Sequence, residues 1–292
     1  MTMKKYWKLL RPHQYLKNGF VWLGLIFTQH FNWYTFSQVG LLFIAFSAAA
    51  SCVYIFNDIF DVEADRLHPT KRNRPIASGT IPVRSAWQWA AGLALLALGL
   101  AISIGWQAMS MISLYLIINL AYSLGLKHVV ILDVFIIAAG FMLRILVGTL
   151  GVGIPPSQWL LLTGLMLTLF LGFAKRRAEL LMLENSHLTD RANMRRVLND
   201  YSPVVLDQLT SITAACTVLS YGLYTVSQET VRIHGTNALF YTLPFVIYGV
   251  FRYLFLLHHH SRGNDTAKDL IADPHLIATG LGWLIVTLAV LA

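Results

Sequence analysis

Residues 57–65 read Asn57-Asp58-Ile59-Phe60-Asp61-Val62-Glu63-Ala64-Asp65, and this stretch decides how the rest of the chain is interpreted. Its carboxylates appear abruptly at the end of a long apolar run, and a basic segment follows at once over residues 66–75. Asp58, Asp61 and Asp65 are spaced at i, i+3 and i+7, so a helix that continues through them would carry all three on one face. The sequence therefore predicts a cluster of three carboxylates at a helix end.

Three carboxylates placed that close together repel one another unless a cation neutralises them. Oxygen ligands suit a hard ion such as Mg²⁺, which keeps several waters and shares its site with substrate phosphates. The alternative is a solvated helix end whose carboxylates pair with neighbouring arginines. Isolated charges at membrane helix ends are common but a one-face aspartate triad is not, so the pattern favours the magnesium site.

The composition indicates a membrane protein. Of the 292 residues, 56% are hydrophobic and only 12% are charged, and the mean hydropathy is +0.59, which is far from the mix of a soluble domain. Apolar stretches long enough to cross a bilayer recur throughout. We predict an all-α polytopic membrane protein with about nine spans, at 20–36, 40–56, 85–104, 107–123, 130–150, 158–174, 205–226, 238–257 and 276–292. The weakest break, between Thr35 and Gly40, separates the first two spans.

The distribution of basic residues predicts the orientation. With the N-terminus in the cytoplasm, all 22 Lys and Arg fall in cytoplasmic segments except Arg232, which lies outside, and Arg144 and Arg252, which lie within spans. Such an asymmetry is what the positive-inside rule describes. We predict a multi-pass protein of a bacterial-type plasma (inner) membrane, with its N-terminus and active site facing the cytoplasm. The net charge of +8 then belongs to one membrane face and does not indicate nucleic-acid binding.

The chain is predicted to form a single transmembrane domain over residues 1–292. Residues 1–18 are typical of a basic interfacial segment, and the longer polar loops, 57–84, 175–204 and 258–275, all fall on the cytoplasmic side. Several spans end there in charged side chains, so we expect one cytoplasm-facing cavity. No Gly-x₄-Gly-Lys-Ser/Thr loop is present, which gives ATP-driven transport no support. The oligomeric state is left open, and a homo-oligomer is compatible with the sequence.

The aspartate stretch resembles the first signature of the UbiA superfamily of intramembrane prenyltransferases. The resemblance rests on Asn57-Asp58-x-x-Asp61-x-x-x-Asp65, followed by Arg66, Lys71, Arg74-Pro75-Ile76-Ala77 and Gly79. In that superfamily this motif binds Mg²⁺ and a substrate diphosphate. The resemblance implies that the metal-binding positions of this chain are Asn57, Asp58, Asp61 and Asp65.

The second motif departs from the prenyl-diphosphate enzymes. Those enzymes usually carry another Asp-rich motif after the sixth span, whereas this chain has Lys175-Arg176-Arg177-Ala178-Glu179 there. Three consecutive cations cannot coordinate a metal, but they can hold a phosphate directly through charge-assisted hydrogen bonds. The alternative is a basic cluster that only sets the membrane orientation.

Further segments resemble the decaprenyl-phosphate phosphoribosyltransferase branch of the superfamily, and the resemblance runs through nearly the whole chain. They are Arg11-Pro12-His13-Gln14-Tyr15-Leu16-Lys17-Asn18, Tyr122-Ser123-Leu124-Gly125-Leu126-Lys127, Leu132-Asp133-Val134, Gly140-Phe141-Met142-Leu143-Arg144, Lys175-Arg176-Arg177-Ala178-Glu179-Leu180 and Asp269-Leu270-Ile271-Ala272-Asp273-Pro274. The resemblance implies transfer of 5-phosphoribose from phosphoribosyl diphosphate to a polyprenyl phosphate in the lipid bilayer. Diphosphate is released, and the product feeds lipid-linked pentose and arabinan synthesis for the cell envelope.

The residues of the chain suit this implied reaction. Mg²⁺ at the aspartates would neutralise the diphosphate that leaves the anomeric carbon. The acceptor is already an anionic phosphate, so it requires positioning rather than a strong base. Asp58, Asp61 and Lys127 are predicted to be catalytic. Substrate binding is predicted for Lys17, Asp65, Arg66, Lys71, Arg74, Tyr122, Lys127, Arg144, Lys175, Arg176, Arg177 and Glu179.

Two of these residues have a structural alternative. Arg144 lies about mid-span, where an isolated charge costs at least about 2.5–3.5 kcal/mol. A role in the cavity is favoured over a purely structural buried pair. Tyr122 can place its phenol beside the phosphates or anchor its helix at the membrane interface.

Two competing functions remain. A UbiA-type prenyltransferase that attaches an isoprenoid chain to an aromatic or other small acceptor explains the aspartates, but it leaves the basic motif at 175–177 without a second metal. A non-catalytic carrier of an anionic lipid or metabolite explains the basic residues, but it gives no reason for the aspartate triad.

Overall fold

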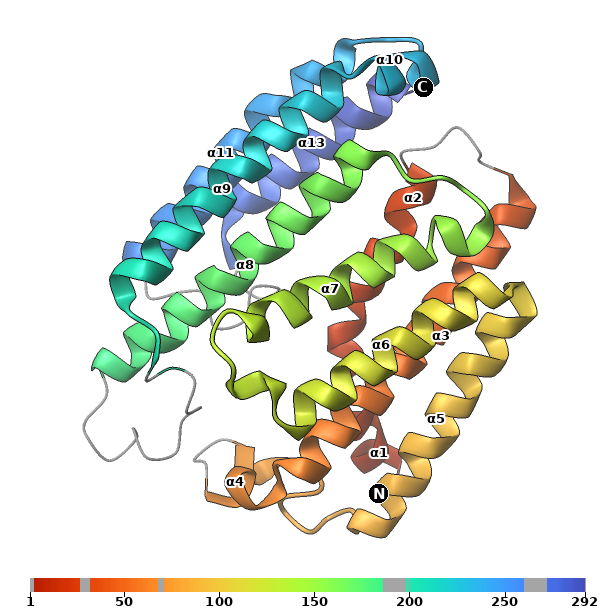
Figure 1. The fold of residues 1–292 in the computed structure, drawn as a ribbon, viewed down its shortest axis with the longest axis vertical. Helices are drawn as coiled ribbons and strands as arrows, with labels where there is room; N and C mark the ends of the chain where they lie inside the picture. Colours follow the sequence, from red (N-terminus) through yellow and green to blue (C-terminus); the bar gives the residue numbers. More distant parts are fainter. Residues whose placement is uncertain are drawn as a thin grey trace. The chain divides into compact units, whose positions relative to one another are not determined.

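The computed structural model describes residues 3–26, 32–67, 71–185, 198, 200–259 and 272–291. Every regular element within these residues is helical (Figure 1). The chain divides into two compact units, Met1–Pro156 and Ser157–Ala292, and each unit has a hydrophobic core of its own. The prediction that the chain forms one domain stays a prediction.

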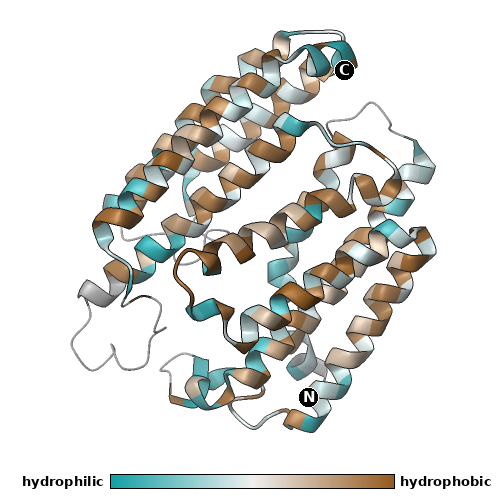
Figure 2. Ribbon diagram, in the orientation of Figure 1, coloured by the Kyte–Doolittle hydropathy of each residue, from teal (hydrophilic) through white to brown (hydrophobic). Residues whose placement is uncertain are grey.

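Eight helices within the described residues are long and apolar enough to cross a membrane, which confirms the predicted all-α membrane class. The first unit holds α3 (Trp33–Phe60), α5 (Val83–Ile104), α6 (Trp106–Leu124) and α7 (Leu132–Val147). The second unit holds α8 (Gln158–Asn185), α9 (Pro203–Val226), α11 (Leu243–His259) and α13 (Pro274–Leu291). Figure 2 shows hydrophobic residues along these helices and hydrophilic residues gathered mainly at their ends and in the short helix α4 (Val62–Leu67).

Capping side chains set two of these helix boundaries. Asn32 caps α3 by accepting a hydrogen bond from the Thr35 amide at 2.8 Å, and Asp273 caps α13 by accepting one from the Leu276 amide at 3.0 Å. Asn and Asp are favoured at this position because their oxygens satisfy amides that have no partner within the helix. The predicted break between Thr35 and Gly40 is wrong, because these residues lie inside α3 and the cap stands before them.

Residues 20–26 of the predicted first span, 20–36, belong to two short elements, and residues 33–36 belong to α3. A 3-10 helix, η1 (Pro12–Trp22, 11 residues), leads into one α-helical turn, α2 (Leu23–Ile26, 4 residues). A 3-10 helix rises about 2 Å per residue against about 1.5 Å in an α-helix, so the two elements together reach about 28 Å. This length is close to the hydrocarbon thickness of a bilayer, about 30 Å.

The η1 helix runs antiparallel to α3. The Tyr15 hydroxyl lies 2.9 Å from Ser51 Oγ, and further along η1 the Trp22 ring packs on Phe36, with ring centroids 5.0 Å apart. Residues later in η1 therefore contact residues earlier in α3. Asn18 and Gly19, within η1, are poor α-helix formers, and the 3-10 helix at this position was not predicted from the sequence.

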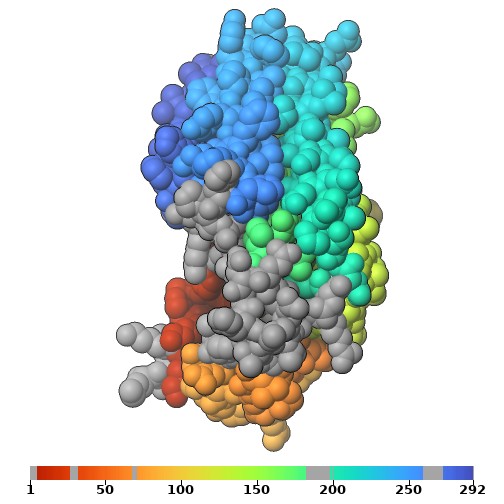
Figure 3. Space-filling model, turned by 90° about the vertical axis from the view of Figure 1, so that its left-hand side faces the viewer, coloured from red at the N-terminus to blue at the C-terminus, as the bar shows by residue number. Residues whose placement is uncertain are grey.

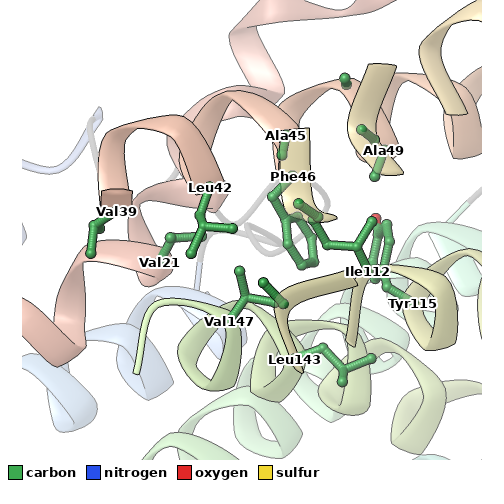
Figure 4. Close-up of a cluster of buried hydrophobic side chains, with 14 of the residues drawn as sticks. Val21, Val39, Leu42, Ala45, Phe46, Ala49, Ile112, Tyr115, Leu143 and Val147 are labelled. Atoms are coloured by element: carbon green, nitrogen blue, oxygen red, sulfur yellow. The ribbon is translucent and has the colours of Figure 1, made fainter. Parts of the chain in front are cut away.

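The core of the first unit lies where η1, α3, α6 and α7 meet (Figure 4). Phe46 of α3 packs on Tyr115 of α6, with ring centroids 4.5 Å apart. Val21, Leu42 and Val147 are fully buried beside them. Because lipid tails are as apolar as these side chains, close packing and interhelical hydrogen bonds hold such a bundle together more than apolar burial does.

Two glycines allow η1 and α2 to approach the end of α7 closely. A Cβ atom on Gly148 would lie 1.7 Å from the Val21 carbonyl oxygen, and a Cβ atom on Gly24 would lie 2.2 Å from Thr149 Cγ2. Gly148 has right-handed backbone angles, φ −78° and ψ −4°, that any residue adopts. Its requirement for glycine is therefore steric, as at the small-residue contacts of other membrane helices.

Replacing Gly148 by alanine is expected to destabilise the protein by about 3 kcal/mol, because the new methyl group and the Val21 carbonyl cannot share one position. Thermal unfolding of the detergent-solubilised protein measures the change. Gly99→Ala in α5 is the matched control, because no heavy atom lies within 4 Å of the added Cβ; it is expected to be neutral or slightly stabilising. Equal melting temperatures for the two variants would contradict the close contact.

The second unit is a bundle of four long helices. Figure 3 shows α9 and α11 side by side along one face of this unit. Phe170 of α8 packs edge-on against Tyr253 of α11, with ring centroids 5.5 Å apart. Trp283 of α13 donates a hydrogen bond from Nε1 to the Tyr221 hydroxyl of α9 at 2.8 Å. These contacts tie all four helices of the unit together.

An ion pair joins α11 to the start of α13. Arg252 donates to both carboxylate oxygens of Asp273, at 3.3 Å from Nε and 2.8 Å from Nη2. This two-point hydrogen bond lowers the pKa of Asp273 to about 2. Asp273 is therefore a carboxylate that caps one helix and neutralises a basic residue of the preceding one.

Candidate active site

The three aspartates of the predicted carboxylate cluster lie at the end of α3 and in the helix that follows it. Asp58 lies in the last turn of α3, Asp61 follows that helix directly, and Asp65 belongs to α4. The backbone stays in helical register across the junction, because the Asp61 amide donates to the Asn57 carbonyl at 2.9 Å and the Asp65 amide to the Asp61 carbonyl at 2.8 Å. The Asp58 and Asp65 side chains are buried, at 2% and 3% exposure, while Asp61 is partly buried.

One guanidinium nitrogen joins Asp58 to Asp65. Arg74 Nη1 lies 3.0 Å from Asp58 Oδ1 and 2.6 Å from Asp65 Oδ2. The two carboxylates therefore lie on one face, as their spacing predicts. Burying an unpaired charge is costly, and the arginine between them compensates both carboxylates at once.

Arg11 is a second cation on Asp58 and is not among the site residues predicted from the sequence. Its Nη2 lies 2.5 Å from Asp58 Oδ1. Arg11 connects α1 (Met3–Leu10) to η1 with left-handed backbone angles, φ 54° and ψ 56°. Such angles cost a non-glycine residue about 1–2 kcal/mol, and the ion pair offsets that cost. The available signal was a basic residue directly before Pro12, where α1 must end.

Asp61 has a partner from a different part of the chain. Lys127 Nζ lies 2.5 Å from Asp61 Oδ1. Lys127 belongs to η3 (Leu126–His128), the 3-10 turn between α6 and α7, and is only 8% exposed. The acidic end of α3 and the basic turn after α6 thus meet at one end of the first unit (Figure 1).

Burial and neighbouring charges act in opposite directions on Asp65. Burial raises the pKa of the Asp65 carboxyl, the Arg74 guanidinium lowers it, and the nearby Asp58 carboxylate raises it. The alternative reading of the aspartates, pairing with neighbouring arginines, is correct about the pairing. It is wrong about solvation, because Asp58 and Asp65 are buried.

The donor set fits a divalent ion that prefers oxygen. Asp58, Asp61 and Asp65 offer carboxylate oxygens, and the Asn57 side chain offers an amide oxygen, which are ligands that Mg²⁺ accepts. The space between Asp58 and Asp65 already suits a cation, because Arg74 Nη1 contacts both. Within the ranges that the structure describes, no three His, Cys, Asp or Glu side chains are preassembled as a metal site. An ion would therefore compete with the arginines and the lysine for the same oxygens.

Other predicted substrate-binding residues of the first unit have their own contacts. Arg66 is exposed, and it donates to Glu63 Oε1 at 2.8 Å and to the Ala77 carbonyl at 3.3 Å. It thus holds the loop after α4 rather than the aspartates. Three further residues are partly buried: Lys17 in η1, Lys71 in η2 (Lys71–Asn73) and Tyr122 in α6.

Arg144 lies in an enclosed site inside the first unit. It is 5% exposed, and its Nε donates to Asn18 Oδ1 at 2.9 Å. Asn18 in turn donates to Ser47 Oγ at 3.0 Å, so the two bonds link α7, η1 and α3. Three aromatic rings surround the guanidinium carbon, with centroids at 4.7, 5.0 and 5.2 Å: Phe46, Phe141 and Tyr115. A contact between Arg144 and substrate stays a prediction.

The basic motif of the second unit lies in α8, and its two arginines contact different carboxylates. Arg176 is fully buried and forms an ion pair with Glu179 on the same helix. Arg177 Nε donates to Asp207 Oδ1 of α9 at 2.8 Å, and His258 Nε2 of α11 lies 3.4 Å from the same oxygen. Consecutive residues point about 100° apart on a helix, which explains the separate partners.

Asp207 has no role among those predicted from the sequence. A lone aspartate near the start of the apolar span at 205–226 was the available signal. Lys175 is partly buried. A phosphate contact for the motif at 175–177, and its juxtaposition with the aspartates of the first unit, stay predictions. The tail element at 269–271 lies outside the described residues.

Comparison with known proteins supports one family throughout. The UbiA prenyltransferase family matches residues 19–272. A decaprenyl-phosphate phosphoribosyltransferase of Corynebacterium glutamicum is 35% identical over 290 residues, which cover 95% of this chain and 83% of that protein. A protein of the same name from Mycobacterium tuberculosis is 35% identical over 234 residues, covering 76% of this chain and 74% of that protein.

Solved structures share the fold. A UbiA homologue from Archaeoglobus fulgidus, bound to GPP and Mg²⁺, has a TM-score of 0.74 at 20% identity, over 98% of this chain and 99% of that one. A UbiA homologue from Aeropyrum pernix in its apo form has a TM-score of 0.65 at 16% identity, over 94% of this chain and 98% of that one. With the sequence match over most of its length, this chain belongs to the UbiA prenyltransferase family.

Proposed function

We propose that this protein is a Mg²⁺-dependent membrane glycosyltransferase. It transfers 5-phosphoribose from phosphoribosyl diphosphate to a polyprenyl phosphate of the decaprenyl type and releases diphosphate. The observation that carries the proposal is the 35% identity to the Corynebacterium glutamicum decaprenyl-phosphate phosphoribosyltransferase over 95% of the chain. The product would be a lipid-linked pentose for arabinan synthesis in the cell envelope.

The acidic cluster of the first unit would hold the donor. Asp58, Asp61 and Asp65, with Asn57 beside them, would be the metal ligands, and the Mg²⁺ in the Archaeoglobus fulgidus homologue supports a divalent ion in this fold. Mg²⁺ bound there would neutralise charge on the departing diphosphate. Arg74 and Lys127, which contact these aspartates, are placed to donate charge-assisted hydrogen bonds to phosphate oxygens.

The transfer itself requires little acid–base chemistry. The bond between the anomeric carbon and the diphosphate oxygen breaks, and its electron pair leaves with the diphosphate. A bond forms between the same carbon and an oxygen of the acceptor phosphate, which is already anionic, so no proton has to be removed. Catalysis then consists of positioning the two substrates and stabilising the charge on the leaving group.

The acceptor phosphate would be held by cations. We assign this role to the basic motif at Lys175, Arg176 and Arg177, with Glu179 orienting Arg176 through their ion pair. Lys17, Lys71, Arg66, Tyr122 and Arg144 complete the proposed substrate-binding set. The distribution of basic residues supports a plasma-membrane protein of a bacterial type, with this site facing the cytoplasm.

A UbiA-type prenyltransferase is the second candidate function, because the family match and the GPP-bound neighbour both favour a prenyl diphosphate donor. The basic motif in α8 argues for the phosphoribosyltransferase. It provides positive charge for a second phosphate group, which a neutral aromatic acceptor does not have.

Diphosphate release by the purified protein separates these functions. In nanodiscs with Mg²⁺, phosphoribosyl diphosphate and a polyprenyl phosphate are expected to yield diphosphate and a lipid-linked phosphoribose, detected by mass spectrometry. The matched polyprenol, which lacks the acceptor phosphate, is expected to give no product. Transfer of a prenyl group from a prenyl diphosphate to an aromatic acid, without use of phosphoribosyl diphosphate, would refute the proposal.

A further inference from the structure

Three basic residues lie directly on the three aspartates of the site. Arg11 and Arg74 contact Asp58 at 2.5 and 3.0 Å, and Arg74 also contacts Asp65 at 2.6 Å. Lys127 contacts Asp61 at 2.5 Å. Lys71 also acts on Asp65 and lowers the pKa of its carboxyl, so within the described residues each of the three aspartates has at least one nearby positive side chain. The buried aspartates do not depend on an added cation to be compensated.

These ion pairs use the oxygen atoms that a divalent ion would need. Arg11 and Arg74 share one atom, Asp58 Oδ1, and Arg74 Nη1 occupies the position that bridges Asp58 to Asp65. A metal ion and a guanidinium cannot occupy the same position between two carboxylates. A metal ion that joins the cluster without releasing these side chains also meets several positive charges within a few ångströms, in a partly desolvated site.

If a metal ion displaces the Arg11 and Arg74 guanidinium groups from the aspartates, these groups require another anion to compensate their charge. A diphosphate group carries several negative charges and many acceptor oxygens, which suits guanidinium and ammonium groups already at the site. Arg11 is well placed for such an exchange. Its side chain is 21% exposed, whereas the Asp58 side chain that it contacts is 2% exposed. The Arg11 backbone, which connects α1 to η1, has strained left-handed angles. The ion pair with Asp58 is one of the contacts that keep Arg11 in this conformation.

We propose that Arg11 and Arg74 are exchangeable counter-ions, which compete with the divalent ion for Asp58 and Asp65 and move to the diphosphate when the ion binds. Arg11 is thereby a functional residue of the site, together with Arg74. This inference rests on the proposed function for the identity of the diphosphate-bearing donor. It predicts that each arginine weakens metal binding alone but strengthens diphosphate binding in the presence of metal.

Two binding measurements on the full chain in nanodiscs test the exchange, and neither requires turnover. The first follows Mn²⁺ binding, without any phosphate, by the loss of the free-ion electron paramagnetic resonance signal. Arg11→Gln and Arg74→Gln are each expected to bind Mn²⁺ roughly tenfold more tightly than the parent protein, because a competing positive charge is gone. The second measures retention of ³²P-diphosphate at saturating Mg²⁺, which is expected to fall roughly tenfold in both variants.

Arg84→Gln is the matched control, because this exposed arginine at the start of α5 lies outside the cluster. It is expected to leave both affinities unchanged. Arg74→Gln leaves Asp58 and Asp65 poorly compensated, so its melting temperature is measured too. Added Mg²⁺ is expected to raise the melting temperature of the Arg74→Gln variant more than that of the parent protein.

The opposite signs of the two effects are decisive. Mn²⁺ affinity that falls or stays equal in both arginine variants would overturn the exchange, because the arginines would then organise the site rather than compete for it. Unchanged diphosphate retention would overturn it as well. Opposite shifts in a protein that does not use phosphoribosyl diphosphate would refute the proposed donor and leave the exchange intact.

Discussion

The Asp58→Asn protein is expected to lose at least about 10³-fold in kcat/KM while it remains folded. Asp58 is buried, contacts both Arg11 and Arg74, and is proposed as a metal ligand, so the substitution removes the central charge of the cluster. An amide of the same shape keeps the packing but binds Mg²⁺ far more weakly than a carboxylate does. Phosphoribose transfer at several Mg²⁺ concentrations measures the loss of activity, and the melting temperature shows whether the protein remains folded.

Glu63→Gln is the control for this substitution. Glu63 lies five residues further along the same acidic stretch, but it is exposed and pairs with Arg66. Its activity is expected to stay within about twofold of the parent value, since exposed ion pairs contribute little. Full activity of the parent protein in excess EDTA would contradict the metal site, and so would an active Asp58→Asn protein.

Replacing Lys127 by methionine is expected to lower kcat by about 10²–10³-fold, the effect of removing one donor that stabilises charge in a transition state. Lys127 is 8% exposed and lies 2.5 Å from Asp61, so its ammonium group is fixed beside the proposed diphosphate position. Methionine keeps most of the length and apolar contact of the side chain. The effect is therefore assigned to the charge.

Leu126→Ala tests whether the η3 turn matters only as a structural element. Leu126 precedes Lys127 in the same short turn and is 37% exposed, so the substitution changes the turn without changing the charge. Its kcat is expected to stay within about threefold of the parent value, on the scale of a surface substitution. A similar loss of kcat in Leu126→Ala and Lys127→Met would mean that Lys127 acts through the turn.

The sequence was sufficient for features that depend on local spacing. The membrane class follows from apolar runs, and the shared face of Asp58 and Asp65 follows from their separation along a nearly continuous helix. Lys127 and Arg74 could be placed in the site because both stand at the end of a helix or in the loop beside it. Arg74 lies close in the chain to the aspartates it contacts, whereas Lys127 reaches Asp61 across 66 positions and was included because its helix end is predicted on the same membrane face.

Features that depend on pairing between distant segments could not be predicted in this way. Arg11 reaches Asp58 across 47 positions, and Arg177 reaches Asp207 across 30. No period or composition of the chain encodes those contacts. Hydropathy likewise could not distinguish a 3-10 helix from an α-helix for η1, because the same apolar residues are compatible with either form.

The polar side chains of η1 affect how this segment can insert into the membrane during synthesis. Lys17 and Asn18 lie within this segment, and a lysine or a lone amide is unfavourable in lipid. Tyr15 and Asn18 reach their partners Ser51 and Ser47 only when α3 is present. The translocon is therefore expected to release η1 and α3 into the bilayer as one hairpin. The η1 segment would stay in the translocon until α3 has been synthesised. The acidic end of α3 and Arg11 would then arrive at the same membrane face together, already paired.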